Sequence, residues 1–253
     1  MKLARREAKG NAMNPREAIT RQVHAALERE ARINLHRYPV GIHNADGVVV
    51  LDGELPDVGA KKLALELAAS VRGVDGVVDR LRVRPSERRG DGAVRDSLVR
   101  MLLAEREFVN CTIRWRANGR VETARLVEAE GIGEIEIEVS DGVIVLEGHV
   151  ISQSHRRFAG VLGWWTPGCR DVVNALAVQP DYGDRDEEVA DVLQIVLEAD
   201  PMVDPSLIRA NCRDKTVILE GAVTTERQKS RAELDAWSLA GVRRVVNRLE
   251  VTD

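Results

Sequence analysis

DGVVVLDG at residues 46–53 recurs in this chain as DGVIVLEG at 141–148 and as DKTVILEG at 214–221. A second phrase begins 24 residues after the last glycine of each copy (53 to 77, 148 to 172, 221 to 245): VVDRL at 77–81, VVNAL at 172–176 and VVNRL at 245–249. Two phrases repeated three times in one register indicate an internal triplication. The repeats start 95 residues apart (46 to 141) and then 73 residues apart (141 to 214), which predicts three small units with modest cores.

The register divides the chain into units at 14–85, 92–180 and 184–253, preceded by a leader at 1–13 that we expect to be disordered. Stretches rich in Gly, Asp, Glu and Arg at 84–92 and 181–188 are predicted linkers. The leader has a basic start but lacks the apolar stretch of a signal peptide, and no apolar run approaches the roughly 20 residues that span a bilayer. Together with three widely spaced cysteines, these features predict a cytoplasmic protein in a reducing compartment.

Each unit reads as helix, strand, strand, helix, strand. A helix is expected at about 15–31, with Val23 and Leu27 on its core face, and alternating apolar residues then run into the Asp-Gly turn of a hairpin. An amphipathic helix follows and ends at Gly73, with counterparts at Gly168 and Gly241. Because a strand, a crossover helix and another strand form a parallel connection, each unit is predicted to be αββαβ. This is an α+β fold with a small mixed three-stranded sheet, two helices on one face, and the other face open to solvent or a neighbour.

Two local features carry further expectations. Gly53, Gly148 and Gly221 recur in the second strand, where a missing side chain predicts the close approach of another element, which we take to be the helix. The third turn has Asp214-Lys215 in place of Asp-Gly, so we expect it to be strained and lengthened. Cys169 and Cys212 occupy slots of core residues and are expected to be small buried hydrophobes, whereas Cys111 is less constrained.

The two phrases and the helix between them resemble the BON domain, the module named for bacterial OsmY and nodulation proteins. The closing GVxxVxNxL phrase is present as GVDGVVDRL at 73–81 and GVRRVVNRL at 241–249, and the second copy departs from it at Cys169. This resemblance covers nearly the whole chain. It implies a non-enzymatic bacterial module that is usually exported or attached to other domains, is associated with envelope stress, and interacts with phospholipid surfaces. Some cytosolic relatives resemble cation-responsive binding proteins.

The second unit has an excess of 22 residues (95 less 73) between its first helix and first strand. Residues 112–117, an Asn-Gly turn and residues 120–127 predict an extra β-hairpin within about 111–130. One interpretation is a contact site for anionic lipid or an acidic partner, formed by Arg114, Trp115, Arg116 and Arg120. The other is an edge hairpin protected by charge and packed with one Trp.

Trp164 and Trp237 occupy the same slot near the ends of equivalent helices, and Trp165 adjoins the first of them. Packing in the core or between repeats is the favoured interpretation, and contact with a membrane or partner is the alternative. The arginine pairs 88–89, 156–157 and 243–244 are offset by nearby acids and read as solvated faces.

The residue pattern excludes several classes of function. The net charge of -4 lacks the basic field of a nucleic-acid-binding protein, and the five histidines show no metal-ligand spacing. No nucleophile, acid-base pair or phosphate loop is present, so we predict no catalytic, cofactor or metal residues and no enzyme. The leading hypothesis is a binding or scaffolding module that acts at an anionic phospholipid surface or on a protein partner under stress. The alternative is a cytosolic sensor of a small ligand or K⁺, held by backbone carbonyls.

Overall fold

The computed structural model describes residues 15–128, 133–179 and 186–252. The predicted leader at 1–13 and residues 181–185 of the second predicted linker lie outside this set. The described residues form two compact units. One contains residues up to 54 together with 64–81, and the other contains 55–63 together with residues from 82 onward.

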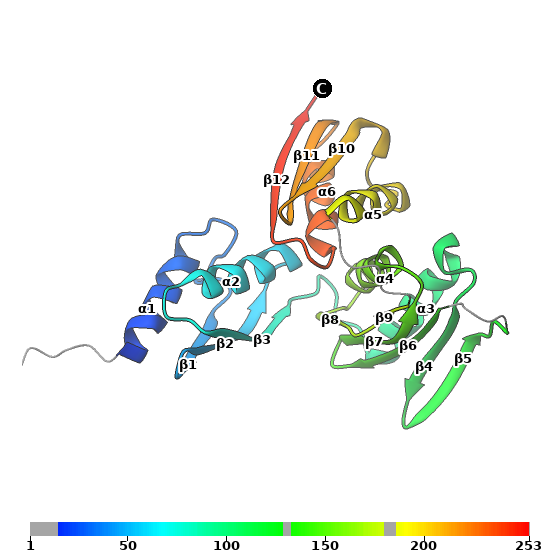
Figure 1. The fold of residues 1–253 in the computed structure, drawn as a ribbon, viewed down its shortest axis with the longest axis horizontal. Helices are drawn as coiled ribbons and strands as arrows, with labels where there is room; N and C mark the ends of the chain where they lie inside the picture. Colours follow the sequence, from blue (N-terminus) through cyan, green and yellow to red (C-terminus); the bar gives the residue numbers. More distant parts are fainter. Residues whose placement is uncertain (1–14, 129–132, 180–185, 253) are drawn as a thin grey trace, which may run out of the picture. The chain divides into compact units, whose positions relative to one another are not determined.

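The first repeat has the predicted αββαβ order. Its elements are α1 (Pro15–Glu28), β1 (Val40–Ala45), β2 (Val48–Leu55), α2 (Val58–Ser70) and β3 (Gly76–Val83). They form a sheet in the order β1-β2-β3, with β1 and β2 antiparallel (Figure 1). Apolar residues at helical spacing in the helices and at alternate positions in the strands are fully buried in the first compact unit: Val23, Leu27, Val49, Leu51, Ala64, Ala68 and Leu81.

The third repeat repeats this plan within the second compact unit. Its elements are α5 (Asp186–Ala199), a 3₁₀ turn at Pro205–Leu207, β10 (Ile208–Arg213), β11 (Thr216–Val223), α6 (Glu226–Ser238) and β12 (Arg244–Val251). The sheet order is β10-β11-β12, with β10 antiparallel and β12 parallel to β11, and α5 and α6 cover one face (Figure 1). The α+β class with small mixed sheets and two helices on one face is therefore confirmed.

The second repeat departs from the prediction in the width of its sheet. Its elements are α3 (Asp91–Ala104), a 3₁₀ turn at Arg106–Phe108, β4 (Thr112–Ala117), β5 (Arg120–Arg125), β6 (Glu134–Ser140), β7 (Val143–Val150), α4 (Gln153–Trp165), β8 (Asp171–Asn174) and β9 (Ala177–Val178). The extra hairpin β4–β5 does not stand apart, because β4 pairs in parallel with β6. The result is a six-stranded sheet in the order β5-β4-β6-β7-β8, with β9 also paired to β7.

All three repeat hairpins close with two-residue turns. Asp46 and Gly47 have φ angles of 50° and 87°, and Asp141 and Gly142 follow the same pattern. The expected lengthening of the third turn is wrong, because Arg213 pairs directly with Thr216 and Lys215 takes a φ of 59°. Positive φ at both central positions matches the right-handed twist of the strands, so the third repeat keeps the turn and accepts the cost of a non-glycine residue there.

The strand glycines do not make room for the helix, which corrects the sequence-based explanation. Gly53, Gly148 and Gly221 pair with the first residues of the preceding strands or their neighbours, and a Cβ on each would overlap the carbonyl oxygen of Pro39, Glu134 or Leu207. Their φ angles are 136°, 113° and 128°, a region that L-residues rarely adopt. The glycine therefore permits a backbone distortion in the second strand of each hairpin, opposite the start of the first strand, and it recurs at the same position in all three repeats.

The closing phrase has a structural role through its asparagine. Asn247 Nδ2 donates to the Lys229 carbonyl oxygen in α6 at 3.0 Å, while its Oδ1 accepts from the Leu249 backbone nitrogen at 3.1 Å. Asn174 makes the equivalent bonds to Arg156 and Leu176 in the second repeat. The asparagine thus ties the last strand to the crossover helix in the second and third repeats. The first repeat has Asp79 at this position, which keeps only the bond from the backbone nitrogen two residues later, Leu81, at 2.9 Å.

The three cysteines are free thiols, and two of them differ from expectation in burial. Cys169 is buried as predicted, but Cys212 is only half-buried, and Cys111, thought to be unconstrained, lies in the core beside Gly133. Burial is the main cause that raises the pKa of the Cys169 thiol to about 12, so this group stays protonated and packs as a small apolar side chain.

Candidate binding surfaces

The arginines of the extra hairpin are paired with acidic residues of the neighbouring strand. Arg114 Nη1 lies 2.6 Å from Glu134 Oε1, and Arg116 forms an ion pair with Glu136. Both glutamates belong to β6, which pairs with β4. These two cations are therefore paired within the sheet, although the Arg116 side chain remains 44% exposed.

Trp115 packs inward from the same hairpin. Its side chain is half-buried against the core of the second unit, and the Arg95 guanidinium lies 5.6 Å from the ring centroid. Arg120 and Val121 remain exposed on β5. This geometry matches the interpretation of a charge-paired edge hairpin packed with one Trp, while lipid or partner contact by Arg114, Trp115, Arg116 and Arg120 stays a prediction.

The second and third repeats share one continuous hydrophobic core, and tryptophans lie in it. Trp237 is 1% exposed and packs against the backbone of Gly59, where an added Cβ would lie 2.9 Å from the indole Cδ1. Trp164 is half-buried with Lys61 Nζ 6.0 Å from its ring centroid. The equivalent slots thus serve packing within the second compact unit, and Trp237 has almost no surface to offer a partner.

Trp165 takes part in a buried polar cluster between α4 and α6. Its Nε1 donates to Asp235 Oδ1 at 3.0 Å, and the Arg231 guanidinium lies 5.2 Å from its ring centroid. Arg231 also pairs with Asp200, which follows α5, and lies 3.5 Å from Asp235 Oδ1. Both carboxyl groups are almost fully buried, so one partly exposed cation faces two buried acids.

Burial raises the pKa of Asp235 from 3.8 to about 8, and the charge of Asp200 adds to this rise while Arg231 and the Trp165 hydrogen bond oppose it. The carboxyl is therefore mostly protonated at neutral pH in the folded chain. Protonation removes the second negative charge, which lets a single arginine serve the pair.

We expect Asp235→Asn to stabilise the protein near neutral pH. The folded state holds the Asp235 proton up to about pH 8, whereas the unfolded state releases it near 3.8, so stability from this group is lost as the pH rises between those values. Asparagine mimics the neutral acid, so the free energy of unfolding of the variant at pH 7 should exceed that of wild type by at least about 1 kcal/mol. Urea unfolding at pH 5, 7 and 8.5 measures this, with the exposed Asp191→Asn as control, and a wild-type stability that does not fall over this range would contradict it.

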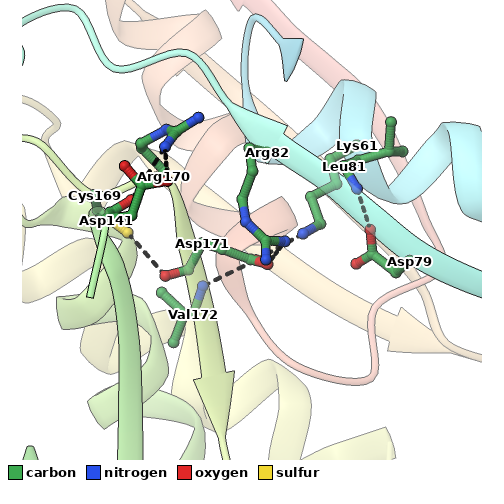
Figure 2. Close-up of polar contacts among 9 residues, drawn as sticks. All are labelled: Lys61, Asp79, Leu81, Arg82, Asp141, Cys169, Arg170, Asp171 and Val172. Carbon is green, nitrogen blue, oxygen red and sulfur yellow. Dashed lines mark hydrogen bonds and ion pairs between the residues drawn. The ribbon is translucent and has the colours of Figure 1, made fainter. Parts of the chain in front are cut away.

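A second buried ionic cluster surrounds the start of β8 (Figure 2). Asp171 Oδ1 lies 2.6 Å from Lys61 Nζ, and its Oδ2 lies 2.7 Å from Arg82 Nη1. Lys61 and Asp171 are 4% and 7% exposed, and all three residues belong to the second compact unit. Arg82 lies in β3, and Asp171 at the start of β8 is the acid with which it pairs.

The open face of the third sheet is basic. Strand pairing places Arg209, Glu220 and Arg248 in one row and Arg213, Thr216 and Arg244 in another. The row between them holds Asn211, Ile218 and Val246. All four of these arginines are exposed. We call these four arginines, with Ile218 and Val246, the basic sheet face.

The matching face of the second sheet has the opposite character. Its outward residues include Glu134, Glu136, Glu138 and Glu147, and only Arg114 and Arg116 offset them. The outward positions of the third sheet carry these four arginines against Glu220 and Glu250, a net charge of two positive (four less two) in a chain whose net charge is -4. The repeats share a fold but display different charges.

The described part of the chain contains neither a candidate metal centre nor a candidate membrane-spanning helix. Within residues 15–128, 133–179 and 186–252 no group of three His, Cys, Asp or Glu side chains could hold a metal ion. No helix among them is both long and apolar enough to cross a bilayer.

The comparison with protein-family models gives a clear result. The BON domain model matches residues 15–85, 118–180 and 185–253, which together make up most of the chain. This chain belongs to the BON domain family. Three tandem BON copies are thus shown, as the repeated phrases predicted. Every match is to this non-catalytic module, and BON domains in general are linked to membrane and phospholipid interaction.

The remaining comparisons add little to the BON assignment. No curated protein matches this chain. Two solved structures of CdsD, a structural protein of the type III secretion system of Chlamydia trachomatis, are similar at 13% identity. One covers 92% of this chain and 96% of its own with a TM-score of 0.24, and the other covers 93% and 92% with a TM-score of 0.23. Such low scores support no functional argument.

Sequence reasoning missed the residues of both ionic clusters and of the basic sheet face. The pair Arg243-Arg244 was noticed but read as a solvated face. Strand alternation in the third BON copy was a usable signal, since Arg209, Arg213, Arg244 and Arg248 all fall on positions opposite to the buried ones. The clusters gave no comparable signal, because Lys61 and Asp171 are 110 residues apart.

Proposed function

We propose that this three-BON protein is a non-catalytic binding and scaffolding module that associates with an anionic phospholipid surface through its third copy, in a stress-related setting. The observation that carries the proposal is the basic sheet face, whose arginines flank a central row that contains Ile218 and Val246. Each cation near an anionic bilayer contributes about 1 kcal/mol, so a net charge of two positive favours weak, reversible and salt-sensitive attachment.

Two further observations support this proposal and its cytoplasmic setting. The face belongs to a three-stranded sheet, and strand pairing fixes the spacing of its arginines. Arg248 does pair with Glu220 at 3.1 Å, but both side chains are about half exposed, and such surface pairs yield readily to a phosphate. Three free cysteines fit a reducing compartment, and the cytoplasmic leaflet is the anionic one.

Co-sedimentation of the full chain with vesicles tests the proposal. We expect binding to phosphatidylcholine vesicles that contain phosphatidylglycerol, and none to pure phosphatidylcholine. Binding should fall as salt shortens the Debye length from about 30 Å at 0.01 M to about 8 Å at 0.15 M. Equal recovery with both vesicle types, or no binding at low salt, would count against the membrane role.

A small-ligand sensor is the second candidate, and one feature favours it. A cleft of about 340 Å³ in the second compact unit is lined by apolar groups together with charged ones, including Trp164, Trp165, Arg84, Arg231 and Asp235. This volume lies within the range of ligand pockets. A ligand that binds only the folded state raises the melting temperature, so a shift with K⁺ that is absent with Na⁺ would support the sensor over the membrane module.

A further inference from the structure

The sheet of the second BON copy ends in a strand with an open edge. β5 pairs with β4 along one side, and among the described strands none pairs with its other side. Unpaired strand edges are templates for another strand, and proteins usually block them. The edge carries Val121, which is 49% exposed, between residues of opposite charge, Arg120 and Glu122.

The register of the hairpin identifies the backbone groups at that edge. Ala117 pairs with Arg120 across the two-residue turn Asn118-Gly119, and such a closing pair is hydrogen-bonded. Because hydrogen-bonded pairs alternate along an antiparallel ladder, the backbone groups of Arg120 and Glu122 face β4. Those of Val121 and Thr123 face outward and can accept another strand.

We propose that β5 pairs antiparallel with β5 of a second copy of this chain, about a twofold axis at Val121. The two Val121 residues then exchange both backbone hydrogen bonds, and Thr123 meets Gly119 of the partner subunit. Arg120 lies opposite Glu122 of the partner subunit in a non-hydrogen-bonded pair, where side chains approach most closely, and symmetry provides the same pair twice. The two sheets become one continuous sheet.

Charge selects this register over its neighbours. An axis at Glu122 places two glutamates face to face, an axis at Arg120 does the same with two arginines, and an axis at Thr123 leaves Arg120 opposite an apolar residue, Leu126. Among these four axes, only the one at Val121 gives two opposite-charge pairs and an apolar contact within β5. The same pattern rejects strands that lack the complementary charges, so the edge is selective for its own copy.

The pairing buries few side chains, so it is expected to be a weak interface that dissociates on dilution. Opposite charges across a strand pair are favourable and like charges unfavourable, so reversing one charge in each subunit converts two attractive pairs into two repulsive ones. We expect each single reversal to weaken dimerisation by about tenfold or more.

Sedimentation equilibrium of the full chain over a range of concentrations tests this. Wild type should approach twice the monomer mass at high concentration, whereas Arg120→Glu and Glu122→Arg should remain monomeric. The double variant Arg120→Glu/Glu122→Arg should dimerise like wild type, and an equimolar mixture of the two single variants should form a heterodimer. The control Arg227→Glu makes the same charge change as Arg120→Glu, at an exposed position of α6, and should leave dimerisation unchanged.

The rescue experiments keep the proposal falsifiable if a single variant folds poorly. A monomeric wild type at the highest soluble concentration would overturn it. So would a double variant that remains monomeric with the wild-type circular dichroism spectrum, or a mixture that fails to associate.

Discussion

Asp171→Ala is expected to destabilise the second compact unit by about 3–5 kcal/mol, the typical cost of removing one partner from a buried ion pair. Lys61 is 4% exposed, so the variant leaves its ammonium without a carboxylate in a site that water hardly reaches. Arg82, which is about one-third exposed, loses its contact with Asp171 but can turn toward solvent. Most of the cost therefore comes from Lys61.

Thermal and urea unfolding measure this effect, and a surface pair supplies the control. Glu220→Ala breaks the exposed contact with Arg248 at 3.1 Å and should cost less than about 1 kcal/mol. Asp171→Asn keeps a hydrogen-bond acceptor and should fall between the two. An Asp171→Ala protein as stable as the Glu220→Ala protein would show that the cluster in Figure 2 does not form in solution.

Gly221→Ala should be the other strongly destabilising change, with a cost of at least about 3 kcal/mol from backbone strain and steric overlap together. The φ of 128° at Gly221 is unfavourable for alanine, and the new Cβ would overlap the carbonyl oxygen of Leu207. A backbone atom cannot rotate away as a flexible side chain can, so β10 must separate from β11 at its first residue.

Gly90→Ala provides the matched control. Gly90 has a φ of -71°, and an added Cβ meets no atom within 4 Å. Because Gly90 is the N-cap of α3, where alanine is less favourable than glycine, this substitution should cost no more than about 1 kcal/mol. If Gly221→Ala unfolds at the same denaturant concentration as Gly90→Ala, the backbone distortion does not explain the strand glycine. The expectation that the glycine makes room for the helix would then have to be considered again.

Most of the fold could be predicted from local sequence signals, and the errors of that prediction have identifiable physical causes. Asp-Gly turns, helical stripes and the terminal glycines Gly73, Gly168 and Gly241 depend on nearby residues, so their signals are local. The role of Gly221 was misassigned because a glycine reports that space is needed, not which element needs it. The extra hairpin was visible as an insertion, but its parallel pairing with β6 was not, since such pairing has no turn signature.

The candidate sites were less predictable because they depend on distant partners. Arg114 and Arg116 looked like free cations in the sequence, and only the register with β6 reveals Glu134 and Glu136 beside them. The raised pKa of Asp235 follows from burial against α4 and α5, which its own helix does not encode. By contrast, the basic sheet face could have been found by applying strand alternation to residues 208–213 and 244–251.

The most direct test of the central proposal is vesicle co-sedimentation of the variant Arg213→Glu/Arg244→Glu, which reverses the row of the basic sheet face that holds no acidic residue. The matched control Arg106→Glu/Arg227→Glu makes the same change in net charge at exposed positions outside that face. We predict that the control binds vesicles containing phosphatidylglycerol as wild type does, while the sheet variant remains in the supernatant with an unchanged melting temperature. Equal binding by the two variants would contradict the proposal that the third BON copy holds the membrane surface.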